Sequence, residues 1–323
     1  MEKLAETPYL SEAQVRERLD AMKVIAAVED GFRTRWPHIV MPQRTHVNTG
    51  DGVFLNMPAY DRSHNILGMK MLFVRDHPPR PEERLRATYM LLDPSTGNIR
   101  LLASADYLTD VRTAAASAVA TKYLAREDVS TLTIFGTGRQ ARAHLKVLTL
   151  IRNFTRVLIA GKDRGETAEF VQEMSGEVKL PIEPVYPSAG AAEADVLCTC
   201  TTATSPLFDG NLIRPGTHLN LIGSFQPHTR EVDTTTIRHS RVVVDTFEGA
   251  LAEAGDLLIP LKEGAITRAS LTSDLHQLVT GRTPPRRNAT EITLFKSVGA
   301  AIEDLVTAEL LCTDPSGTNE GVS

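Results

Sequence analysis

The sequence predicts an α/β protein in which a doubly wound parallel sheet is joined to a discontinuous α+β domain with an antiparallel sheet. Three observations support this fold class. A glycine turn at 136–141 separates an apolar segment from a helical pattern, strand-like and helical segments alternate beyond it, and residues 39–104 hold short apolar runs without an intervening helix. The predicted domains are 113–293 for the parallel sheet, and 1–112 with 294–323 for the discontinuous domain.

Composition limits the possible classes of protein. The chain has 323 residues, 42% hydrophobic and 23% charged, which is typical of a globular protein with room for two domains. A formal net charge of -5 offers no general attraction for nucleic acid or anionic lipid. No apolar run approaches membrane-spanning length and the N-terminus lacks a leader-like apolar region, so we expect a cytoplasmic protein.

The cysteines predict neither a disulfide framework nor a metal site. Cys198, Cys200 and Cys312 are too few and too poorly spaced for either. Cys198 and Cys200 alternate within a buried-strand pattern, so we interpret them as core residues. We therefore expect no bound metal.

The N-terminal part begins with a predicted helix and continues as a sheet. Ser11 and Gln14 form a capping-box pattern. Apolar residues follow at helical spacing as far as Pro37, namely Val15, Leu19, Met22, Ile25 and Ala26. The predicted strands are 38–47, 52–58, 66–74, 87–93 and 99–104, antiparallel because no helix separates them. Such a sheet needs a cover for one face and a partner for its edge, which a second subunit could supply.

An alanine-rich helix is predicted from Thr113 to about Ala125. Arg112 would then stand at the helix start, where free backbone N–H groups favour an anion. Its guanidinium could hold a carboxylate through two parallel hydrogen bonds. From the residues alone, a structural pair with Asp110 is an equally good interpretation.

The turn at 136–141 has the form of a phosphate-binding turn in a Rossmann domain. Gly136 permits a tight turn, Gly138 lets the backbone approach a pyrophosphate, and Ala141 lets the helix lie close to the strand. The other residues of the turn are Thr137, Arg139 and Gln140. We therefore predict a dinucleotide bound at the N-terminus of the following helix.

Alternating elements follow this turn. Strands are expected at 156–160, near 184–186, and at 195–200, 218–222 and 241–245, with helices at 165–175 and 189–194. After the strand at 156–160, an acidic residue usually holds the ribose of NAD. Here Gly161 is followed by the basic residues Lys162 and Arg164. These residues favour NADP(H), and NAD(H) stays possible because Asp163 lies between them.

The C-terminal part is expected to be mainly helical. Residues 247–263 have helical and loop-like patterns, and 281–287 form a predicted surface turn. A final long helix is predicted at 293–311, which would pack on the N-terminal sheet. The polar tail at 313–323 is predicted to be disordered.

Motifs spread over nearly the whole chain resemble the ornithine cyclodeaminase/μ-crystallin family. They are Met41-Pro42-x-Arg44-Thr45, Met57-Pro58-Ala59-Tyr60, Lys70, Arg112-Thr113-Ala114-Ala115, Gly136-x-Gly138-x-Gln140-Ala141, Pro215-Gly216-Thr217-His218, Arg230-Glu231, Gly255-Asp256 and Phe295-Lys296-Ser297-x-Gly299. The resemblance implies a homodimer joined through the N-terminal sheets, with the discontinuous domain as the substrate-binding and dimerisation domain. It also implies a nicotinamide cofactor in the Rossmann domain and a small carboxylate-bearing imine or amino acid between the domains.

The resemblance implies that Arg44, Lys70 and Arg112 line the substrate pocket. Guanidinium groups there could hold a carboxylate, and a lysine could donate a proton. Alternation by itself favours a solvent-facing Lys70, so only the resemblance places it in the pocket. Further implied contacts are Thr113, Lys296 and Ser297 with the cofactor, and Met57, Phe225 and His228 with the substrate. From the residues alone His228 is better explained as an exposed loop histidine, Asp245 as a cap, and Arg230 with Glu231 as a structural pair.

Two departures from the family pattern narrow the reaction. Ornithine cyclodeaminases carry acidic residues where this chain has Leu55 and Phe225, so no base or cation anchor for a free diamine is evident. The μ-crystallin branch also lacks the acid at the position of Phe225 and resembles cyclic ketimine reductases. We predict NAD(P)H-dependent reduction of a ketimine such as Δ1-pyrroline-2-carboxylate or Δ1-piperideine-2-carboxylate to an L-amino acid. The alternatives are ornithine cyclisation, an alanine or opine-type dehydrogenase, and an NADP-dependent small-molecule binder.

Overall fold

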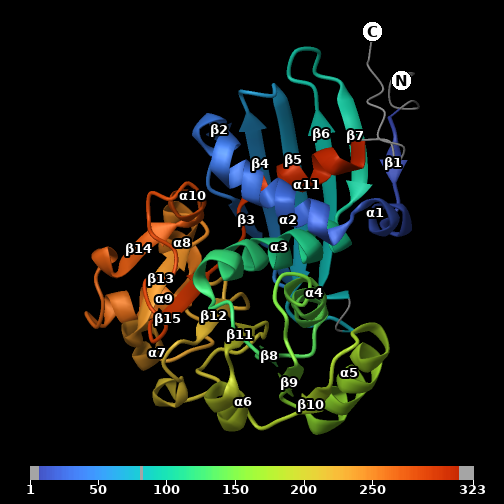
Figure 1. Ribbon diagram of the computed structural model, residues 1–323. Coiled ribbons are helices and arrows are strands. Elements are labelled where there is room, and N and C mark those ends of the chain that lie inside the picture. The colour runs from blue at the N-terminus through green and yellow to red at the C-terminus, as the bar shows by residue number, and fades with distance from the viewer. Residues whose placement is uncertain (1–6, 81–82, 313–323) are drawn as a thin grey trace. The chain divides into compact units, whose positions relative to one another are not determined.

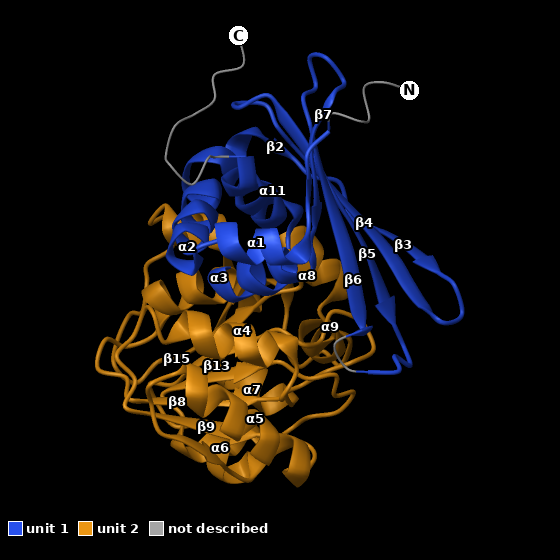
Figure 2. Cartoon of the chain, turned by 90° about the vertical axis from the view of Figure 1, so that its right-hand side faces the viewer, with its two compact units in different colours: residues 1–115, 300–323 blue, residues 116–299 orange. Residues whose placement is uncertain are grey.

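The computed structural model describes residues 7–80 and 83–312 (Figure 1). The chain forms two compact units, of which unit 1 comprises residues 1–115 and 300–323 and unit 2 comprises residues 116–299 (Figure 2). The predicted domain boundaries lie at 112/113 and 293/294. The predicted tail at 313–323 lies outside the described residues. Within residues 7–80 and 83–312, no helix combines the length and apolar character needed to cross a membrane.

Unit 1 is built on a seven-stranded sheet in the order β1-β7-β6-β5-β4-β2, with β3 paired to β4. Its strands are β1 (Tyr9–Leu10), β2 (Ile39–Val40), β3 (Thr45–Asn48), β4 (Gly52–Asp61), β5 (Ile66–Arg75), β6 (Leu85–Leu92) and β7 (Ile99–Ser104). All pairs are antiparallel except β1 with β7, which confirms the predicted kind of sheet. Helices α1 (Glu12–Arg18), α2 (Ala21–Asp30) and α11 (Ala301–Glu309) lie on one side of this sheet (Figure 2).

The predicted first helix is broken into two. The capping box is present, since Ser11 N donates to Gln14 Oε1 at 2.9 Å, but α1 ends at Arg18. Asp20 then caps α2 by accepting from Lys23 N at 2.9 Å. This new start shifts the buried face of the second helix. Val15, Leu19 and Ile25 are buried as predicted. Met22 and Ala26 are exposed, and Val24 and Val28 are buried in their place. Beyond α2 the chain continues as a short π-helix (Gly31–Arg35) and a 3₁₀-helix (Trp36–His38).

The alanine-rich helix begins earlier than predicted. Helix α3 spans Asp106–Leu124, so Arg112 lies in its interior and not at its start. The Asp106 carboxylate accepts from Ala87 N at 2.7 Å and from Arg86 at 2.8 Å, which ties the first turn of the helix to β6. The expectation that free N–H groups surround Arg112 is therefore wrong, because those groups belong to residues about two turns earlier.

Unit 2 is a doubly wound domain with an eight-stranded parallel sheet in the order β10-β9-β8-β11-β12-β15-β13-β14. Its strands are β8 (Thr131–Phe135), β9 (Arg156–Ala160), β10 (Ile182–Pro184), β11 (Val196–Thr199), β12 (His218–Leu221), β13 (Ser240–Val244), β14 (Leu271–Asp274) and β15 (Ile292–Lys296). Its helices are α4 (Arg139–Leu148), α5 (Arg164–Glu177), α6 (Pro187–Glu193), α7 (Thr234–His239), α8 (Phe247–Glu253), α9 (Gly255–Lys262) and α10 (Leu275–Val279). The predicted α/β fold class is confirmed. The strand order reverses between β8 and β11, the place where doubly wound sheets bind ligands.

The final predicted helix is partly wrong, and β14 was not predicted. Residues 292–296 form β15, a strand inserted between β12 and β13. A strand buried on both faces has a continuous apolar run without alternation, which resembles the start of a buried helix. Helix α11 begins only at Ala301, after Gly299 with φ +88°.

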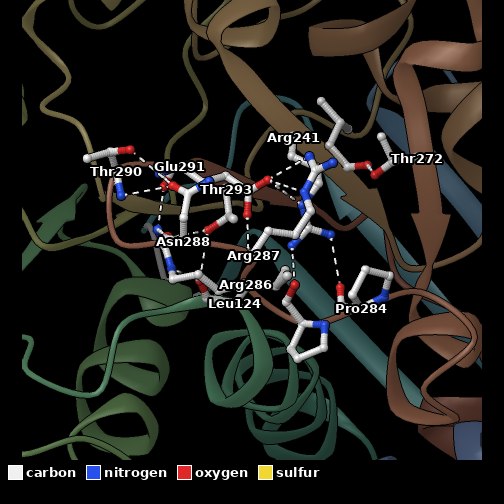
Figure 3. Close-up of polar contacts among 12 residues, drawn as sticks. Leu124, Arg241, Thr272, Pro284, Arg286, Arg287, Asn288, Thr290, Glu291 and Thr293 are labelled. Carbon is white, nitrogen blue, oxygen red and sulfur yellow. Dashed lines mark hydrogen bonds and ion pairs between the residues drawn. The ribbon is translucent and has the colours of Figure 1, made fainter.

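The predicted surface turn at 281–287 is held by inward-pointing arginines, drawn in Figure 3. Arg241 on β13 donates to Glu291 at 3.0 Å and to the carbonyl of Pro285 at 3.0 Å. Arg286 donates to the carbonyl of Leu124 at 2.7 Å, at the end of α3. These bonds fix the chain just before it enters β15.

Candidate functional site

A buried row of side chains crosses the sheet of unit 1 at Lys70. Strand pairing sets Lys70 on β5 opposite Met57 on β4 and Tyr89 on β6. All three are almost fully buried, and the side chain of Lys70 is 0% exposed. Lys70 shares its face with Gly68 and Leu72, and this face is the one that α11 covers. The interpretation from alternation, that Lys70 faces solvent, is therefore wrong.

Lys70 and Arg112 meet at two carboxylates of α11. Lys70 Nζ lies 2.7 Å from Asp304 Oδ1, and Arg112 Nε lies 2.8 Å from the same oxygen. Arg112 Nη1 also lies 2.6 Å from Glu303 Oε2. Two cations and two carboxylates therefore balance one another within unit 1, as buried charges must.

The sequence analysis did not single out Glu303 and Asp304. Every residue of α11 from Ala301 to Ala308 is buried. Two adjacent carboxylates in an otherwise apolar helical segment are the signal that could have identified them, because buried acids need cationic partners. The structure pairs Arg112 with both of these carboxylates.

This arrangement changes the acidity of Lys70. Burial, and next the charge of Arg112, lower the pKa of Lys70 to about 7, although Asp304 and Glu303 oppose the shift. A buried ammonium is costly to desolvate, and a neighbouring cation repels it. Near neutral pH the side chain is thus divided between ammonium and amine, which suits a group that gives or takes a proton.

Arg44 occupies a loop next to the same helix. It is half-buried and directly precedes β3. The loop is joined to α11 because Met41 Sδ accepts from Ala301 N at 3.1 Å. The structure brings Lys70 and Arg112 together, and it places Arg44 in a separate loop. Thr113, on α3, donates to the carbonyl of Thr109 at 2.7 Å and is buried.

The glycine turn of unit 2 can accommodate a pyrophosphate. Gly136 has φ +106°, and a Cβ there would lie 2.6 Å from the carbonyl oxygen of Cys200. A Cβ on Gly138 would meet nothing within 4 Å, so space is open beside its backbone. Helix α4 begins at Arg139, with Ala141 buried against the sheet. The turn therefore has the open space and the helix N-terminus that a dinucleotide phosphate requires.

The end of β9 presents basic side chains. Asp163 is engaged as the cap of α5, because its Oδ1 accepts from Glu166 N at 2.9 Å. The guanidinium of Arg164 lies over the ring of Tyr186, 5.2 Å from its centroid. Lys162 and Arg164 are both exposed. The acid between them is thus held by its own helix, while both cations stay at the surface, Arg164 against Tyr186.

Three buried carboxylates hold the loops at the carboxyl ends of the strands. Asp245 accepts from the backbone of Val298 and Gly299, both at 2.7 Å, and from Ser297 Oγ at 3.1 Å. Asp256 lies 3.0 Å from Lys296 Nζ, and neither is exposed. Asp245 therefore supports the loop that carries Ser297, and Lys296 is held inside unit 2.

Glu231 is the third of these carboxylates. It accepts from Thr199 Oγ1 at 2.7 Å, Thr201 N at 2.8 Å and Gly223 N at 2.7 Å, which joins the loops after β11 and β12. Burial raises the pKa of Glu231, and the charge of Asp256 adds to this effect. The predicted pair of Arg230 with Glu231 is wrong, because Arg230 Nε donates to the carbonyl of Val232 instead.

The predicted substrate contacts of unit 2 lie on one loop. Phe225 is half-buried and packs against the apolar core of the unit. His228, three residues later, is exposed. Of the three further residues predicted to contact the substrate, Met57 lies beside Lys70 in unit 1, whereas Phe225 and His228 belong to unit 2.

Comparison with known proteins identifies the family to which these features belong. The model of the ornithine cyclodeaminase/mu-crystallin family matches residues 5–317. A Delta(1)-pyrroline-2-carboxylate reductase from Bacillus cereus is 35% identical over 266 residues, 80% of each chain. The ketimine reductase mu-crystallin from Rattus norvegicus is 33% identical over 311 residues, covering 94% of this chain and 96% of that protein.

A solved structure is similar over nearly the whole chain. It is the Delta(1)-pyrroline-2-carboxylate reductase of Thermococcus litoralis in complex with NADH and L-proline. The TM-score is 0.89 at 36% sequence identity, covering 94% of this chain and 95% of that one. Both the fold class and the family predicted from the sequence are confirmed.

The charge network predicts how Lys70 responds to a change in its partner. In Asp304→Asn the carboxylate that raises the pKa of Lys70 is lost, so Lys70 should titrate at a pH lower by roughly one unit or more. The ε-carbon NMR signal of Lys70 against pH measures this directly. Glu309→Gln, on the same helix but paired with Arg35, should leave the titration unchanged. A Lys70 that stays ammonium up to about pH 10 in the wild-type chain would contradict the proposed environment.

Proposed function

The chain belongs to the ornithine cyclodeaminase/mu-crystallin family, and we propose that it reduces the C=N bond of a cyclic ketimine with a nicotinamide cofactor. The substrate class is a ring imine carrying a carboxylate beside the imine carbon, such as Δ1-pyrroline-2-carboxylate or Δ1-piperideine-2-carboxylate. The product is the corresponding L-amino acid. The observation that carries this proposal is Lys70, a buried lysine with a pKa near 7 placed next to the guanidinium of Arg112.

The residues of unit 1 account for substrate binding and for the proton. A guanidinium has five N–H donors, so the bonds of Arg112 to Glu303 and Asp304 are compatible with a further bond to a substrate carboxylate. Arg44 supplies a second cation for the same carboxylate. An added negative charge favours the ammonium form of Lys70. Substrate binding thus places a proton on Nζ, ready for the imine nitrogen.

The cofactor is assigned to the glycine turn of unit 2. Gly136 and Gly138 leave room for the pyrophosphate, and backbone N–H groups at the start of α4 face it. Thr137, Arg139 and Gln140 complete this site, and Ser297, whose hydroxyl donates to Asp245, is assigned as a further contact of the cofactor. When bound, a nicotinamide supplies the hydride that reduces the imine carbon.

Leu55 and Phe225 argue against a diamine as the substrate. Leu55 is buried within β4, and Phe225 packs on the core of unit 2. Neither can serve as a base or bind a second amine. An apolar Phe225 fits instead beside a ring that has no distal charge.

Separate assays of NADPH oxidation test the reaction. We expect turnover with Δ1-pyrroline-2-carboxylate or its six-membered homologue, and little with pyruvate plus an amine. Ornithine should give no proline and no ammonia. Conversion of ornithine to proline without imine reduction would reject the proposal in favour of a cyclodeaminase.

Lys70→Met tests the assigned proton donor in the same assay. We expect kcat to fall by roughly 10²–10⁴-fold, the range for loss of a positioned acid, while NADPH affinity stays near that of the parent chain. Lys23→Met, an exposed lysine of α2, is the matched control and should change neither. A purely structural role for Lys70 would instead lower the melting temperature and cofactor binding together with the rate.

We propose NADP(H) as the preferred cofactor. Lys162 and Arg164 supply positive charge at the end of β9, and Asp163 is occupied as a helix cap. A 2′-phosphate would gain charge-assisted hydrogen bonds from these two side chains. A bare ribose gains nothing comparable.

Cofactor titrations with a double variant test this preference. Lys162→Ala with Arg164→Ala should weaken NADPH binding by roughly 10²–10⁴-fold, because hydrogen bonds to charged groups contribute about 1.5–3 kcal/mol each, and should leave NADH binding almost unchanged. Lys179→Ala, another exposed lysine of unit 2, is the control. Equal losses for both cofactors would contradict the assignment.

We also propose a homodimer formed through the open face of the unit 1 sheet. Large apolar side chains on that face are only half-buried: Phe54, Leu67, Met69, Met71, Phe73, Met90, Leu92 and Leu102. The helices of the unit lie on the opposite face (Figure 2). A contiguous apolar face of this kind is typical of an interface between subunits.

A charged residue in the middle of that face should disrupt the dimer. Met69→Lys on β5 is expected to yield a monomer by analytical ultracentrifugation, because an unpaired charge is costly at a buried interface. Met22→Lys changes a methionine that is 50% exposed on α2 and should leave the mass unchanged. A parent chain that already sediments as a monomer would refute the proposed dimer.

A further inference from the structure

Three potential metal ligands meet in unit 2 at the side chains of His144, Cys198 and Cys200. Their ligand atoms all lie within 4.8 Å of one another. Cys198 and Cys200 alternate at the end of β11, so both sulfurs face the same side of the sheet, with an Sγ–Sγ distance of 3.5 Å. His144 approaches from α4, the helix that follows the phosphate turn. None of these side chains has a part in the proposed reduction.

Hydrogen bonds orient the imidazole of His144. Its Nδ1 lies 2.8 Å from the carbonyl oxygen of Gln140, which can only accept, so Nδ1 carries the proton. The other nitrogen, Nε2, therefore has a lone pair, and Ser117 Oγ lies 2.9 Å from it. Metal-binding histidines are commonly held in this way, with one N–H bound to a carbonyl and the other nitrogen directed at the ion.

The donor set selects a class of ion. Two thiols and one imidazole suit thiophilic divalent ions such as Zn²⁺ and Cd²⁺, with water or the Ser117 hydroxyl as a fourth ligand. Mg²⁺ and Ca²⁺ prefer carboxylate and carbonyl oxygen, which these three side chains lack. The thiol protons leave to solvent as metal–sulfur bonds form.

We propose that His144, Cys198 and Cys200 form a binding site for a thiophilic divalent metal ion directly beneath the phosphate turn. The carbonyl of Cys200 packs against Gly136, and the carbonyl of Gln140 holds His144. An ion that draws α4 toward the end of β11 would therefore change the geometry of the turn. Occupancy should weaken dinucleotide binding, a consequence that rests on the proposed cofactor site.

Titration of the full-length chain with Cd²⁺ tests the site without any measurement of activity. We expect one equivalent to bind with a thiolate-to-metal charge-transfer band in the ultraviolet. Cys198→Ser and Cys200→Ser should each lower the intensity of the band by about half, because one of two thiolates is lost, and should weaken binding by more than the roughly 10–100-fold typical of an outer-shell partner. Cys312→Ser removes the exposed third cysteine, which lies in unit 1, and is the matched control.

The outcomes separate the site from its effect on the cofactor. A band that keeps its full intensity in Cys198→Ser and in Cys200→Ser, or that disappears in Cys312→Ser, overturns the proposal. If circular dichroism shows that the serine variants do not fold, the cadmium NMR shift of the parent chain tests the site instead, because the shift depends on how many thiolates bind the ion. A shift typical of two thiolate ligands supports the site, and a shift typical of none refutes it. One equivalent of Zn²⁺ should also weaken NADPH binding several-fold, reversibly with a chelator. If the metal binds and the affinity for NADPH is unchanged, the metal site stands and only its proposed effect on cofactor binding is refuted.

Discussion

The structure of unit 1 depends on the burial of charge at Lys70 and Arg112. Neither cation could stay inside without a carboxylate. Asp304 accepts a hydrogen bond from Lys70 and forms an ion pair with Arg112, and Glu303 completes the balance of charge. Loss of one partner from such a buried group typically costs about 3–5 kcal/mol. The requirement explains why a segment from the C-terminal end of the chain packs on a sheet made by the first hundred or so residues. Burial and the neighbouring charge of Arg112 explain how Lys70 can hold a pKa of about 7 in a folded protein.

Buried carboxylates also stabilise unit 2, where they hold loops in place. These loops lie at the carboxyl ends of the parallel strands and are not part of the backbone hydrogen-bonding pattern of the sheet. Glu231 joins the loops after β11 and β12, and Asp245 holds the loop after β15. Loops fixed in this way are already arranged for a ligand, which reduces the ordering cost of binding.

In the proposed reaction the two units have different roles. Unit 1 would supply the cations and a group that transfers a proton, and unit 2 would bind the dinucleotide at its glycine turn. Relatives named as pyrroline-2-carboxylate and ketimine reductases share this chain's architecture over most of its length. The absence of acids at Leu55 and Phe225 agrees with imine reduction, because this reaction needs neither a diamine anchor nor ring closure. The cysteine cluster beside the phosphate turn is a property that the reaction does not require.

The sequence by itself determined the fold class, the antiparallel strands, the glycine turn and the family, because each depends on local periodicity or on short motifs. Only the tertiary structure decided where Lys70 points, since alternation defines two faces but not which of them α11 covers. It also decided that Arg112 lies inside α3, that residues 292–296 form a strand, and that His144 meets Cys198 and Cys200. These features arise from contacts between residues far apart in the chain. Their partners leave no local pattern from which they could be predicted.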